Sequence, residues 1–551
     1  MPITPTYPGV YIEEIPSGVH TITGVATSIT AFIGDAAWGP VSDQADSPAP
    51  AVINSFADYE RLFGGLWVNS PMSYAVRDFY LNGGSQAVIV RLAHGGVAST
   101  ITLPEDTIPA SPPDSPLSSS SSSLVLVAAS VGSWGSNLYA LVDHKTKRLN
   151  GQVDILLFNL TVTLMDSQRQ RVLATEKFLN LSVDPASPRY VTNVLKENSA
   201  LVRVQQDNSG NDEVPGAFPA ETYTTILSPP QVVPNPVWAT AGSDGGALTD
   251  NDLIGPGTDV AKTGLYALEK TDLFNLLSIP PYENDDVSTA VVAAAASYCE
   301  QRRAFYLLDS PSDWTSKTTA VNKFTDANQD WIGTRSKNAA LFFPRLREPN
   351  PLHDNQIETF VASGAVAGIF ARTDAQRGVW KAPAGQEATL NGVPQLSVPL
   401  TDAENGELNP LGVNCLRAFP IVGRVVWGAR TLDGADQLAS EWKYTPVRRT
   451  ALFIEESLYR GTKWVVFEPN DEPLWAQIRL NVGAFMHNLF RQGAFQGANP
   501  RDAYFVKCDK ETTTQNDIDL GIVNILVGFA PLKPAEFVVI QIQQMAGQIQ
   551  V

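Results

Sequence analysis

Residues 501–551 constrain the possible folds of this chain more than any other stretch. They contain strand patterns, but the sequence does not show which strands they pair with. Apolar and polar side chains alternate along two runs within residues 501–529, separated by a polar link at 510–519, and this pattern predicts a long hairpin. After two prolines, residues 537–543 predict a third strand, and no charged residue follows Glu536. An exposed apolar edge promotes aggregation unless something covers it. The last strand therefore either folds into its own sheet or pairs with a neighbouring copy of the chain.

The other end of the chain shows a similar feature. Pro2, Pro5 and Pro8 keep the start extended, residues 10–15 predict a short strand, and a second β-branched run covers 19–33. Two strand-bearing ends allow one subunit to join neighbours on two sides. The candidate arm residues are Val10, Tyr11, Ile12, Val19 and Ile22 at the N-terminus, and Phe537, Val538, Val539, Ile540 and Ile542 at the C-terminus.

Composition excludes several classes of function. The net charge of −18 argues against binding to nucleic acid or to an anionic membrane surface. Five histidines and three cysteines without a CxxC spacing predict no metal site, no cofactor and no disulfide framework, and they suit a reduced cytoplasmic setting. The N-terminus has no features of a secretion signal. No run approaches the roughly 20 apolar residues that a membrane helix needs, so membrane insertion is not expected.

At 551 residues, the chain is long enough for three or four domains, and the expected fold class is a multidomain α+β or α/β protein. Its α/β core domains carry β-strand arms at both ends and an inserted, mostly β outer domain. The insert contains the low-complexity linker SPPDSPLSSSSSS at 111–123, and residues 99–250 hold 15 acidic against 9 basic residues. The expected segments are an N-terminal extended β arm (1–34), the first part of an α/β domain (35–98), the acidic insert (99–245), the second part of the α/β domain (246–372), a C-terminal core domain (373–535) and a C-terminal β arm (536–551).

Local patterns predict alternating helices and strands in the α/β domain. The expected helices cover residues 55–63, 74–81, 267–277, 288–302, 321–331, 357–372 and 447–460, with a further helix that begins near 471 and ends before Gly493. The expected strands cover residues 87–92, 303–309, 339–344, 424–428 and 463–468. Apolar residues at helical spacing on the helix that begins near 471 indicate a core-facing stripe, formed by Trp475, Ile478, Val482, Phe485, Met486 and Leu489.

No catalytic constellation is evident. The chain has no HExxH, GxSxG, Walker or GxGxxG pattern in the required context. Asp309 ends a predicted strand, where α/β enzymes keep catalytic acids, but no second acid or histidine is placed to help it. Because their spacing does not match a Ca²⁺ loop, solvated turn carboxylates are expected at Asp509, Glu511, Asp517 and Asp519. His487, beside the apolar stripe, is expected at a helix surface.

Several strings, in order along the chain, resemble the contractile tail sheath proteins of phages and of phage-like injection systems. PGVYIEEIPSG and ITGVATSITAFIGDAAWGP open the likeness. It continues through NGGSQAVIVRL at 82–92, SGAVAGIFARTDAQRGVWKAPAG at 363–385, LTDAENGELNPLGVNCLRAF at 400–419 and VVWGARTL at 425–432, and then from 442 to 547. Each string alone has low specificity, whereas their order and spacing are specific. The insert resembles the family least.

The resemblance implies a structural subunit, not an enzyme, in hexameric rings stacked helically around an inner tube. Such a sheath is metastable when extended, and it contracts to drive the tube through a target envelope. Baseplate and terminator or cap proteins would be further partners, and assembly would occur in the bacterial cytoplasm. A C-terminal arm and another subunit's N-terminal arm would join the hairpin of a third subunit, whose acceptor residues are Tyr504, Val506, Val523, Ile525 and Val527.

The family places its C-terminal domain innermost, against the tube. Residues 441–510 hold 10 basic against 8 acidic residues in an otherwise acidic chain, so this segment could face an acidic partner. The candidate tube contacts are Arg479, Arg491, Arg501 and Lys507. Two alternatives remain at this point: a static shell or baseplate component, and an α/β hydrolase-like enzyme.

Overall fold

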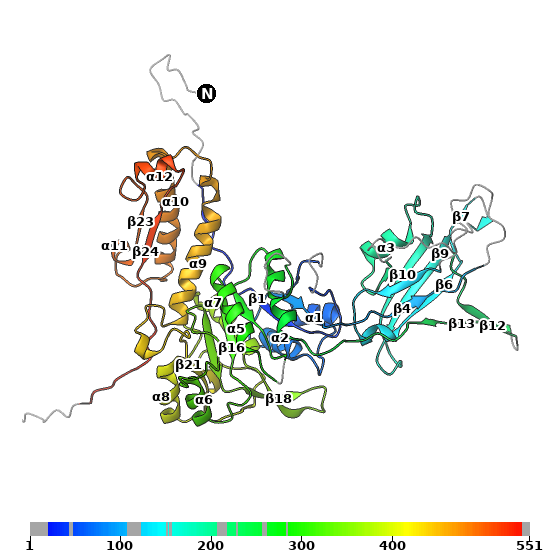
Figure 1. Cartoon of the computed structure of the whole chain (residues 1–551), viewed down its shortest axis with the longest axis horizontal. Coiled ribbons are helices and arrows are strands. Elements are labelled where there is room, and N and C mark those ends of the chain that lie inside the picture. The colour runs from blue at the N-terminus through cyan, green and yellow to red at the C-terminus, as the bar shows by residue number, and fades with distance from the viewer. Residues whose placement is uncertain are drawn as a thin grey trace, which may run out of the picture.

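The computed structural model describes residues 20–42, 48–106, 123–149, 152–153, 157–206, 218–227, 230–255, 262–282 and 285–542. A central α/β domain carries the inserted β domain on one side and the C-terminal domain on another (Figure 1). The mixed α/β class expected from the sequence is confirmed. The arm residues Val10, Tyr11, Ile12 and Val19, and nearly all of the Ser/Pro-rich linker, lie outside the described residues.

An eight-stranded sheet forms the centre, in the order β2-β3-β1-β15-β16-β17-β21-β22. Its six inner strands are parallel, and the two edge strands pair antiparallel. The inner strands are nearly continuous apolar runs, as both faces of a parallel sheet are covered. The strands are β1 (Thr30–Gly34), β2 (Ala51–Ile53), β3 (Ala87–Arg91), β15 (Leu276–Ser278), β16 (Phe305–Asp309), β17 (Ala339–Phe343), β21 (Val413–Phe419) and β22 (Gly423–Val426).

This sheet corrects two expected boundaries. β1 lies between β3 and β15, fully buried, so residues 30–34 belong to the central sheet and not to an N-terminal arm. β21 and β22 also belong to this sheet, although the sequence assigned them to the C-terminal domain. The sequence also missed β21 as a strand. Its buried polar Asn414 interrupts the apolar pattern, and only the tertiary partners of that amide explain its place.

Helices cover the two faces of the sheet and enclose two separate cores. On β1, Ala31 and Ile33 face one core and Phe32 faces the other, as strand alternation requires. The first core lies under α4 (Asp250–Ile254), α5 (Thr289–Gln301), α6 (Lys317–Phe324), α8 (Asp402–Leu408) and the 3₁₀ helix η2 (Gly264–Lys270). The second core lies under α1 (Phe56–Phe63), α2 (Pro71–Leu81) and α7 (Ser363–Arg377).

Some expected elements differ from the observed ones because tertiary pairing overrides local pattern. Residues 357–372 were expected as one helix, but Gln356–Phe360 forms β19, which pairs with β18 (Leu346–Asn350) in a hairpin that β20 (Gln395–Leu396) joins. The expected helix at 267–277 is η2 followed by β15. The expected helix at 321–331 is α6, which ends at Phe324. The expected strand at 463–468 contains the 3₁₀ turn η5 (Lys463–Val465).

The inserted domain has its own hydrophobic core. It contains one sheet in the order β10-β9-β6-β14 and a second in the order β11-β5-β4. The chain enters and leaves side by side, through bridges between His94 and Gly246 and between Val97 and Ser243. Its elements are β4 (Thr100–Thr102), β5 (Val125–Ala128), η1 (Ser133–Asn137), β6 (Leu138–Asp143), β7 (Arg148–Leu149), β8 (Gln152–Val153), β9 (Leu157–Met165), β10 (Val172–Ser182), α3 (Val191–Asn198), β11 (Val202–Val204), β12 (Tyr223–Leu227), β13 (Pro230–Pro234) and β14 (Val237–Trp238).

The C-terminal domain is built on two long helices, α9 (Thr445–Gly461) and α10 (Glu472–Arg491). Asp471 caps α10, accepting a hydrogen bond from the backbone N–H of Leu474. The predicted apolar stripe on α10 is confirmed, since all six of its residues are buried in the core of this domain. After α10, this domain contains α11 (Pro500–Ala503), β23 (Tyr504–Lys507), α12 (Gln515–Asp519) and β24 (Leu526–Phe529). Two short 3₁₀ helices, η3 (Asn409–Leu411) and η4 (Asp436–Leu438), precede α9 in the chain.

Two glycines let α7 cross α2 at close range. A Cβ on Gly364 would lie 2.1 Å from the carbonyl oxygen of Ala75, and a Cβ on Gly368 would lie 2.4 Å from that of Phe79. Both clashes are with backbone, which cannot rotate away. The crossing therefore depends on the absence of these two side chains.

We expect Gly364→Ala to lower the free energy of unfolding by about 1–3 kcal/mol, the cost of overpacking. Gly406→Ala on α8 is the matched control, since no heavy atom lies within 4 Å of its added Cβ. The control should raise stability by about 0.5–1 kcal/mol, through the lower entropy of its unfolded chain. Urea titrations followed by circular dichroism measure both, and equal midpoints would contradict the crossing geometry.

Two buried carboxyl groups share one guanidinium beside the β18–β19 hairpin. Arg77 Nη2 lies 2.7 Å from Asp78 and 2.6 Å from Glu348, and both acids are almost fully buried. Burial raises the pKa of Glu348, and the charge of Asp78 raises it further, while Arg77 offsets only part of the rise. A carboxyl whose pKa is raised in the folded state stabilises the protein most below its unfolded pKa of about 4.3, and that contribution is lost as pH rises.

Unfolding free energy should therefore fall as pH rises from about 5 toward 9, and Glu348→Gln should flatten this dependence. Denaturant titrations at several pH values measure it. Glu407→Gln, which removes a half-exposed carboxylate from the pair with Lys317, is the control and should keep the wild-type slope. A Glu348→Gln profile parallel to wild type would show that this group does not carry the effect.

Candidate inter-subunit assembly site

The predicted terminal hairpin is present as a two-stranded antiparallel sheet of β23 and β24. Tyr504 pairs with Phe529, and Val506 pairs with Val527. α12 lies within the link between the two strands, where the sequence predicted only a polar connection. Within the described residues, no further strand joins this sheet, so the outer edges of both strands lack a ladder partner. Such edges are the sites at which a strand from another chain can pair.

One face of the hairpin is fixed to its own domain. The five candidate acceptor residues are partly buried against the core that α10 lines: Tyr504, Val506, Val523, Ile525 and Val527. Phe505 and Leu526 alternate with them and are about half exposed. Packing therefore holds the hairpin rigid while leaving its edges accessible, which is the state an acceptor sheet requires.

Residues 537–542 of the C-terminal arm leave the body instead of folding onto it. The candidate arm residues form no strand within this chain, and they are 74–93% exposed: Phe537, Val538, Val539, Ile540 and Ile542. Of the two outcomes that the sequence left open, burial in its own sheet is excluded for residues 537–542. An apolar β-branched run in this state has neither backbone partners nor a cover for its side chains.

The arm is fastened to the body at Glu536, the last partly buried residue that the structure describes. Its carboxylate accepts two hydrogen bonds of 2.7 Å from Nε and Nη2 of Arg430, and a third of 3.1 Å from the Tyr444 hydroxyl. Burial would raise the pKa of Glu536, but the hydrogen bonds and charge of Arg430 outweigh burial and lower it. The carboxylate is therefore ionised at neutral pH.

Arg430 is a fully buried cation. Its Nη1 also contacts Asp436 at 3.0 Å, and its backbone is held by two hydrogen bonds with the Asn414 side chain on β21. Sequence reasoning missed this pair. The available signal was that Glu536 is the last charge before an apolar strand and Arg430 the only charge in the string VVWGARTL.

The segment that follows the undescribed N-terminus is packed against its own C-terminal domain. His20 stacks on Trp464 with ring centroids 4.2 Å apart, and its backbone N–H donates to Asn481. Ile22 is buried in the core of this domain and meets Gly461 closely. Ile22 therefore belongs to the core of its own subunit, contrary to its assignment to an arm.

The four candidate tube contacts do not form one cluster. Arg479 donates a hydrogen bond to the carbonyl of Cys508 and pairs with Glu472 at 2.6 Å. Its guanidinium is therefore already bound by groups of its own chain. Lys507 pairs with Glu511 at 3.6 Å. Arg491 lies about 18 Å further along α10, at 1.5 Å per residue. Arg491 and Arg501 are both exposed.

The acids considered for chemistry have structural partners. Asp309 Oδ1 accepts hydrogen bonds of 2.8 Å from the backbone N–H groups of Ala362 and Ser363, which start α7. Burial raises its pKa. On the hairpin link, the carboxylates of Asp509, Asp517 and Asp519 accept hydrogen bonds from their own loop and helix, while Glu511 pairs with Lys507. His487 is exposed and contacts the Tyr504 hydroxyl.

Neither a metal cluster nor a membrane span is found in the part of the chain that the structure describes. No group of three or more His, Cys, Asp or Glu side chains there could hold an ion. No helix there is long and apolar enough to cross a membrane.

The described part of the chain thus combines a rigid α/β body with an exposed apolar arm and an open-edged hairpin, which are features of a structural subunit. The central-domain model of phage tail sheath proteins matches residues 255–432, and the C-terminal-domain model of the same proteins matches residues 438–545. The chain belongs to the phage tail sheath family.

Two sequence relatives carry the same description. A prophage major tail sheath protein of Pseudomonas aeruginosa (strain UCBPP-PA14) is 26% identical over 284 residues, which are 50% of this chain and 67% of the relative. The tail sheath protein of Vibrio phage KVP40 is 27% identical over 177 residues, which are 32% of this chain and 25% of the phage protein. The chain thus spans only a quarter of the KVP40 protein in that alignment.

Solved structures share the fold over almost the whole chain. The contracted helical sheath of the anti-feeding prophage matches with a TM-score of 0.55 and 22% identity, covering 98% of this chain and 100% of that one. The six-fold symmetrised baseplate structure of the same particle matches with a TM-score of 0.53, 22% identity and the same coverage. A sheath tail protein from Listeria innocua matches with a TM-score of 0.55 and 13% identity, covering 93% and 96% of the two chains.

The role of Asp309 can be tested directly. We expect Asp309→Ala to lower the free energy of unfolding by about 1–2 kcal/mol, because the first turn of α7 loses its acceptor, whereas Asp309→Asn, which keeps one acceptor oxygen, should cost less. Glu407→Ala on the surface of α8 should change stability by less than about 0.5 kcal/mol. If Asp309→Ala were as stable as this control in urea titrations, the carboxylate would have no structural role.

Proposed function

We propose that this chain is the subunit of a contractile sheath. It polymerises helically around an inner tube, is held metastable in an extended form, and contracts to drive the tube through a target envelope. The observation that carries this proposal is the exposed apolar arm beside an open-edged two-stranded sheet, on a chain of the tail sheath family.

The arm supplies a tether whose strength comes from the backbone and from apolar burial. Each net hydrogen bond stabilises by about 0.5–1.5 kcal/mol, so an arm with about six of them contributes several kcal/mol. Burying each exposed Val, Ile or Phe side chain of the arm adds about 1.5–3 kcal/mol. Binding entropy opposes both terms. The sum is a strong link that constrains one strand and leaves the bodies free to rotate.

The open edges of the β23–β24 sheet are the proposed acceptors. One edge takes the C-terminal arm of a second subunit, and the other takes the N-terminal arm of a third. Hexameric rings would then be linked both within and between layers, and the six-fold baseplate structure of a similar protein supports that symmetry. Contraction would draw on better burial between bodies in the compact state, summed over many copies and without a nucleotide.

The C-terminal domain is the proposed tube-facing part. Its segment 441–510 carries 10 basic against 8 acidic residues in a chain whose net charge is −18. Arg491 and Arg501 are exposed and suited to an acidic tube surface, while Arg479 and Lys507 would have to exchange partners first. Baseplate and terminal cap proteins would bind the two ends of the polymer, and assembly would take place in the bacterial cytoplasm.

Truncation of the arm tests the proposal. Deleting residues 537–551 leaves Glu536 in place and should give folded subunits with an unchanged melting temperature, because residues 537–542 make no strand pairing with the body. These subunits should form no striated tubes in negative-stain microscopy, whereas wild type should.

Val172→Lys on the inserted domain is the control, since Val172 is an exposed apolar residue outside both arms, and it should assemble normally. Striated tubes from the truncated chain would refute strand sharing. Closed rings or shells from wild type, without tubes, would favour a static shell or baseplate component.

A further inference from the structure

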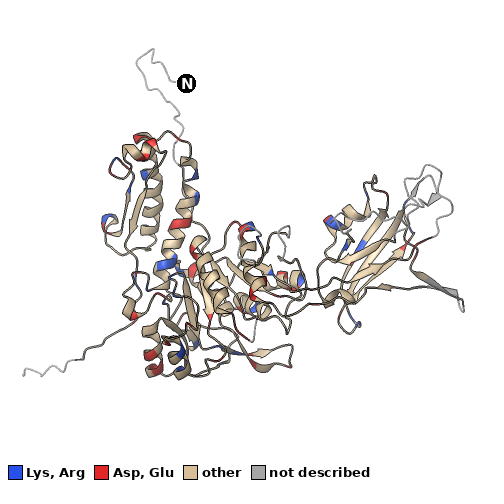
Figure 2. Ribbon diagram, viewed as in Figure 1, with Lys and Arg blue, Asp and Glu red and all other residues tan. Residues whose placement is uncertain are grey.

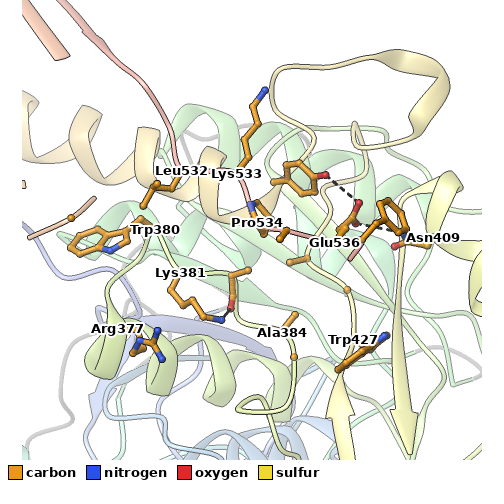
Figure 3. Close-up of a pocket in the computed structure, with 18 of the residues that line it drawn as sticks. Arg377, Trp380, Lys381, Ala384, Asn409, Trp427, Leu532, Lys533, Pro534 and Glu536 are labelled. Atoms are coloured by element: carbon orange, nitrogen blue, oxygen red, sulfur yellow. Dashed lines mark hydrogen bonds between the residues drawn. The ribbon is translucent and has the colours of Figure 1, made fainter. Parts of the chain in front are cut away.

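Residues 532–536, which connect the hairpin to the arm, line a cavity. The strand contacts of the hairpin end with Ala530, which bonds Ala503 and Gln496, and with a bridge from Pro531 to Phe495. Beyond Pro531, the chain forms one wall of a cavity of about 920 Å³. The opposite wall includes Trp380, Lys381 and Trp427, as Figure 3 shows.

Little apolar packing holds this segment down. Lys533 and Ala535 are exposed, and Leu532 and Pro534 are only partly buried. Glu536 in contrast makes three hydrogen bonds with Arg430 and Tyr444 and approaches Asn409 at 3.5 Å. A buried guanidinium is costly unless it is paired, so Arg430 strongly favours keeping this carboxylate in place. The attachment of the segment is therefore concentrated in a single side chain.

We propose that Glu536 positions the C-terminal arm: its ion pair with Arg430 clamps the root of the arm to the central domain, so that only residues from Phe537 onward transfer to a neighbouring subunit. This inference rests on the proposed function and names the residue that fixes where the shared strand begins. Arg430 is suited to this role because Asn414 binds its backbone to β21.

The clamp shortens the tether between subunits. With the clamp closed, the free arm begins after Glu536, and with it open, the free arm begins after Pro531, five residues earlier (536 − 531 = 5). Five extended residues add at most about 18 Å of reach, at roughly 3.3–3.6 Å per residue. A sheath lattice whose spacing is set by arm length would therefore depend on this ion pair.

The test compares Glu536→Gln with Glu387→Gln. The first removes the charge that Arg430 pairs with and keeps the shape of the side chain. The second removes the carboxylate charge from the exposed Arg377–Glu387 pair near the same cavity, and this pair makes no hydrogen bond or ion pair with the described residues of the arm. Glu536→Asp is a further variant, which keeps the charge but shortens the side chain by one methylene.

In the unassembled subunit, a nitroxide spin label attached at the exposed position Ala535, through Ala535→Cys, should be more mobile in Glu536→Gln than in wild type and unchanged in Glu387→Gln. Labelling is selective because the three native cysteines are buried. Glu536→Asp should fall between them. In electron micrographs, Glu536→Gln polymers should show variable or enlarged layer spacing, whereas Glu387→Gln polymers should match wild type.

Unchanged mobility of the label at position 535 in Glu536→Gln would overturn the clamp, and so would polymers with the wild-type layer spacing. Either result would leave the proposed function standing if the chain without residues 537–551 still fails to assemble. If that truncated chain forms tubes, strand sharing itself is wrong, whatever the mobility of the label at position 535 shows.

Discussion

Every backbone N–H and C=O group in a strand needs a partner, and this requirement divides the molecule into a complete part and an incomplete part. The six inner strands of the central sheet meet this requirement along both edges, because each lies between two other strands of the sheet. The hairpin of β23 and β24 meets it along one edge of each strand only. The strand-forming sequence of the arm does not meet it within residues 537–542. In the proposed assembly, strands from neighbouring subunits would supply the partners that the hairpin edges and residues 537–542 lack.

The buried ion pairs determine where a load on the arm would go. Through Glu536 and Arg430, the arm root is connected to Asn414 on β21, in the central sheet. The C-terminal domain is joined to the same body by a second buried pair, in which Arg449 on α9 contacts Asp374 on α7 at 2.5 Å. Since neither pair lies in the hairpin, tension on a subunit's own arm would pass into its sheet and spare its acceptor strands. A subunit could then hold a neighbour's arm while its own arm is pulled.

Local pattern predicted most of the scaffold and few of the contacts that position the arms. The stripe on α10 and the apolar runs of β3, β16 and β17 carry their own periodicity, so the sequence located them within a few residues. β21 was missed because Asn414 breaks its apolar run, and its amide is satisfied only by Leu341 and by Arg430, 16 residues away. Glu536 and Arg430 are 106 residues apart, and no spacing rule connects them. Ile22 was misplaced for the same reason, since alternation shows that a residue suits a strand but not which surface covers it.

The two proposed attachments of the arm, strand pairing and the clamp, differ in what they require of the sequence. Strand pairing uses backbone groups, so it tolerates almost any alternating apolar segment and can persist between chains that share few residues. The clamp needs a carboxylate at one position and a buried guanidinium at another, and a single substitution breaks it. In a tether that uses both attachments, the strand-pairing part tolerates many sequences, whereas the ion pair at Glu536 requires two particular side chains. The shared strands could then change in sequence while the point at which the arm leaves the body stays fixed. In the proposed sheath, that fixed point would make the arm a defined length of chain between two rigid bodies, which a coordinated rearrangement of many subunits requires.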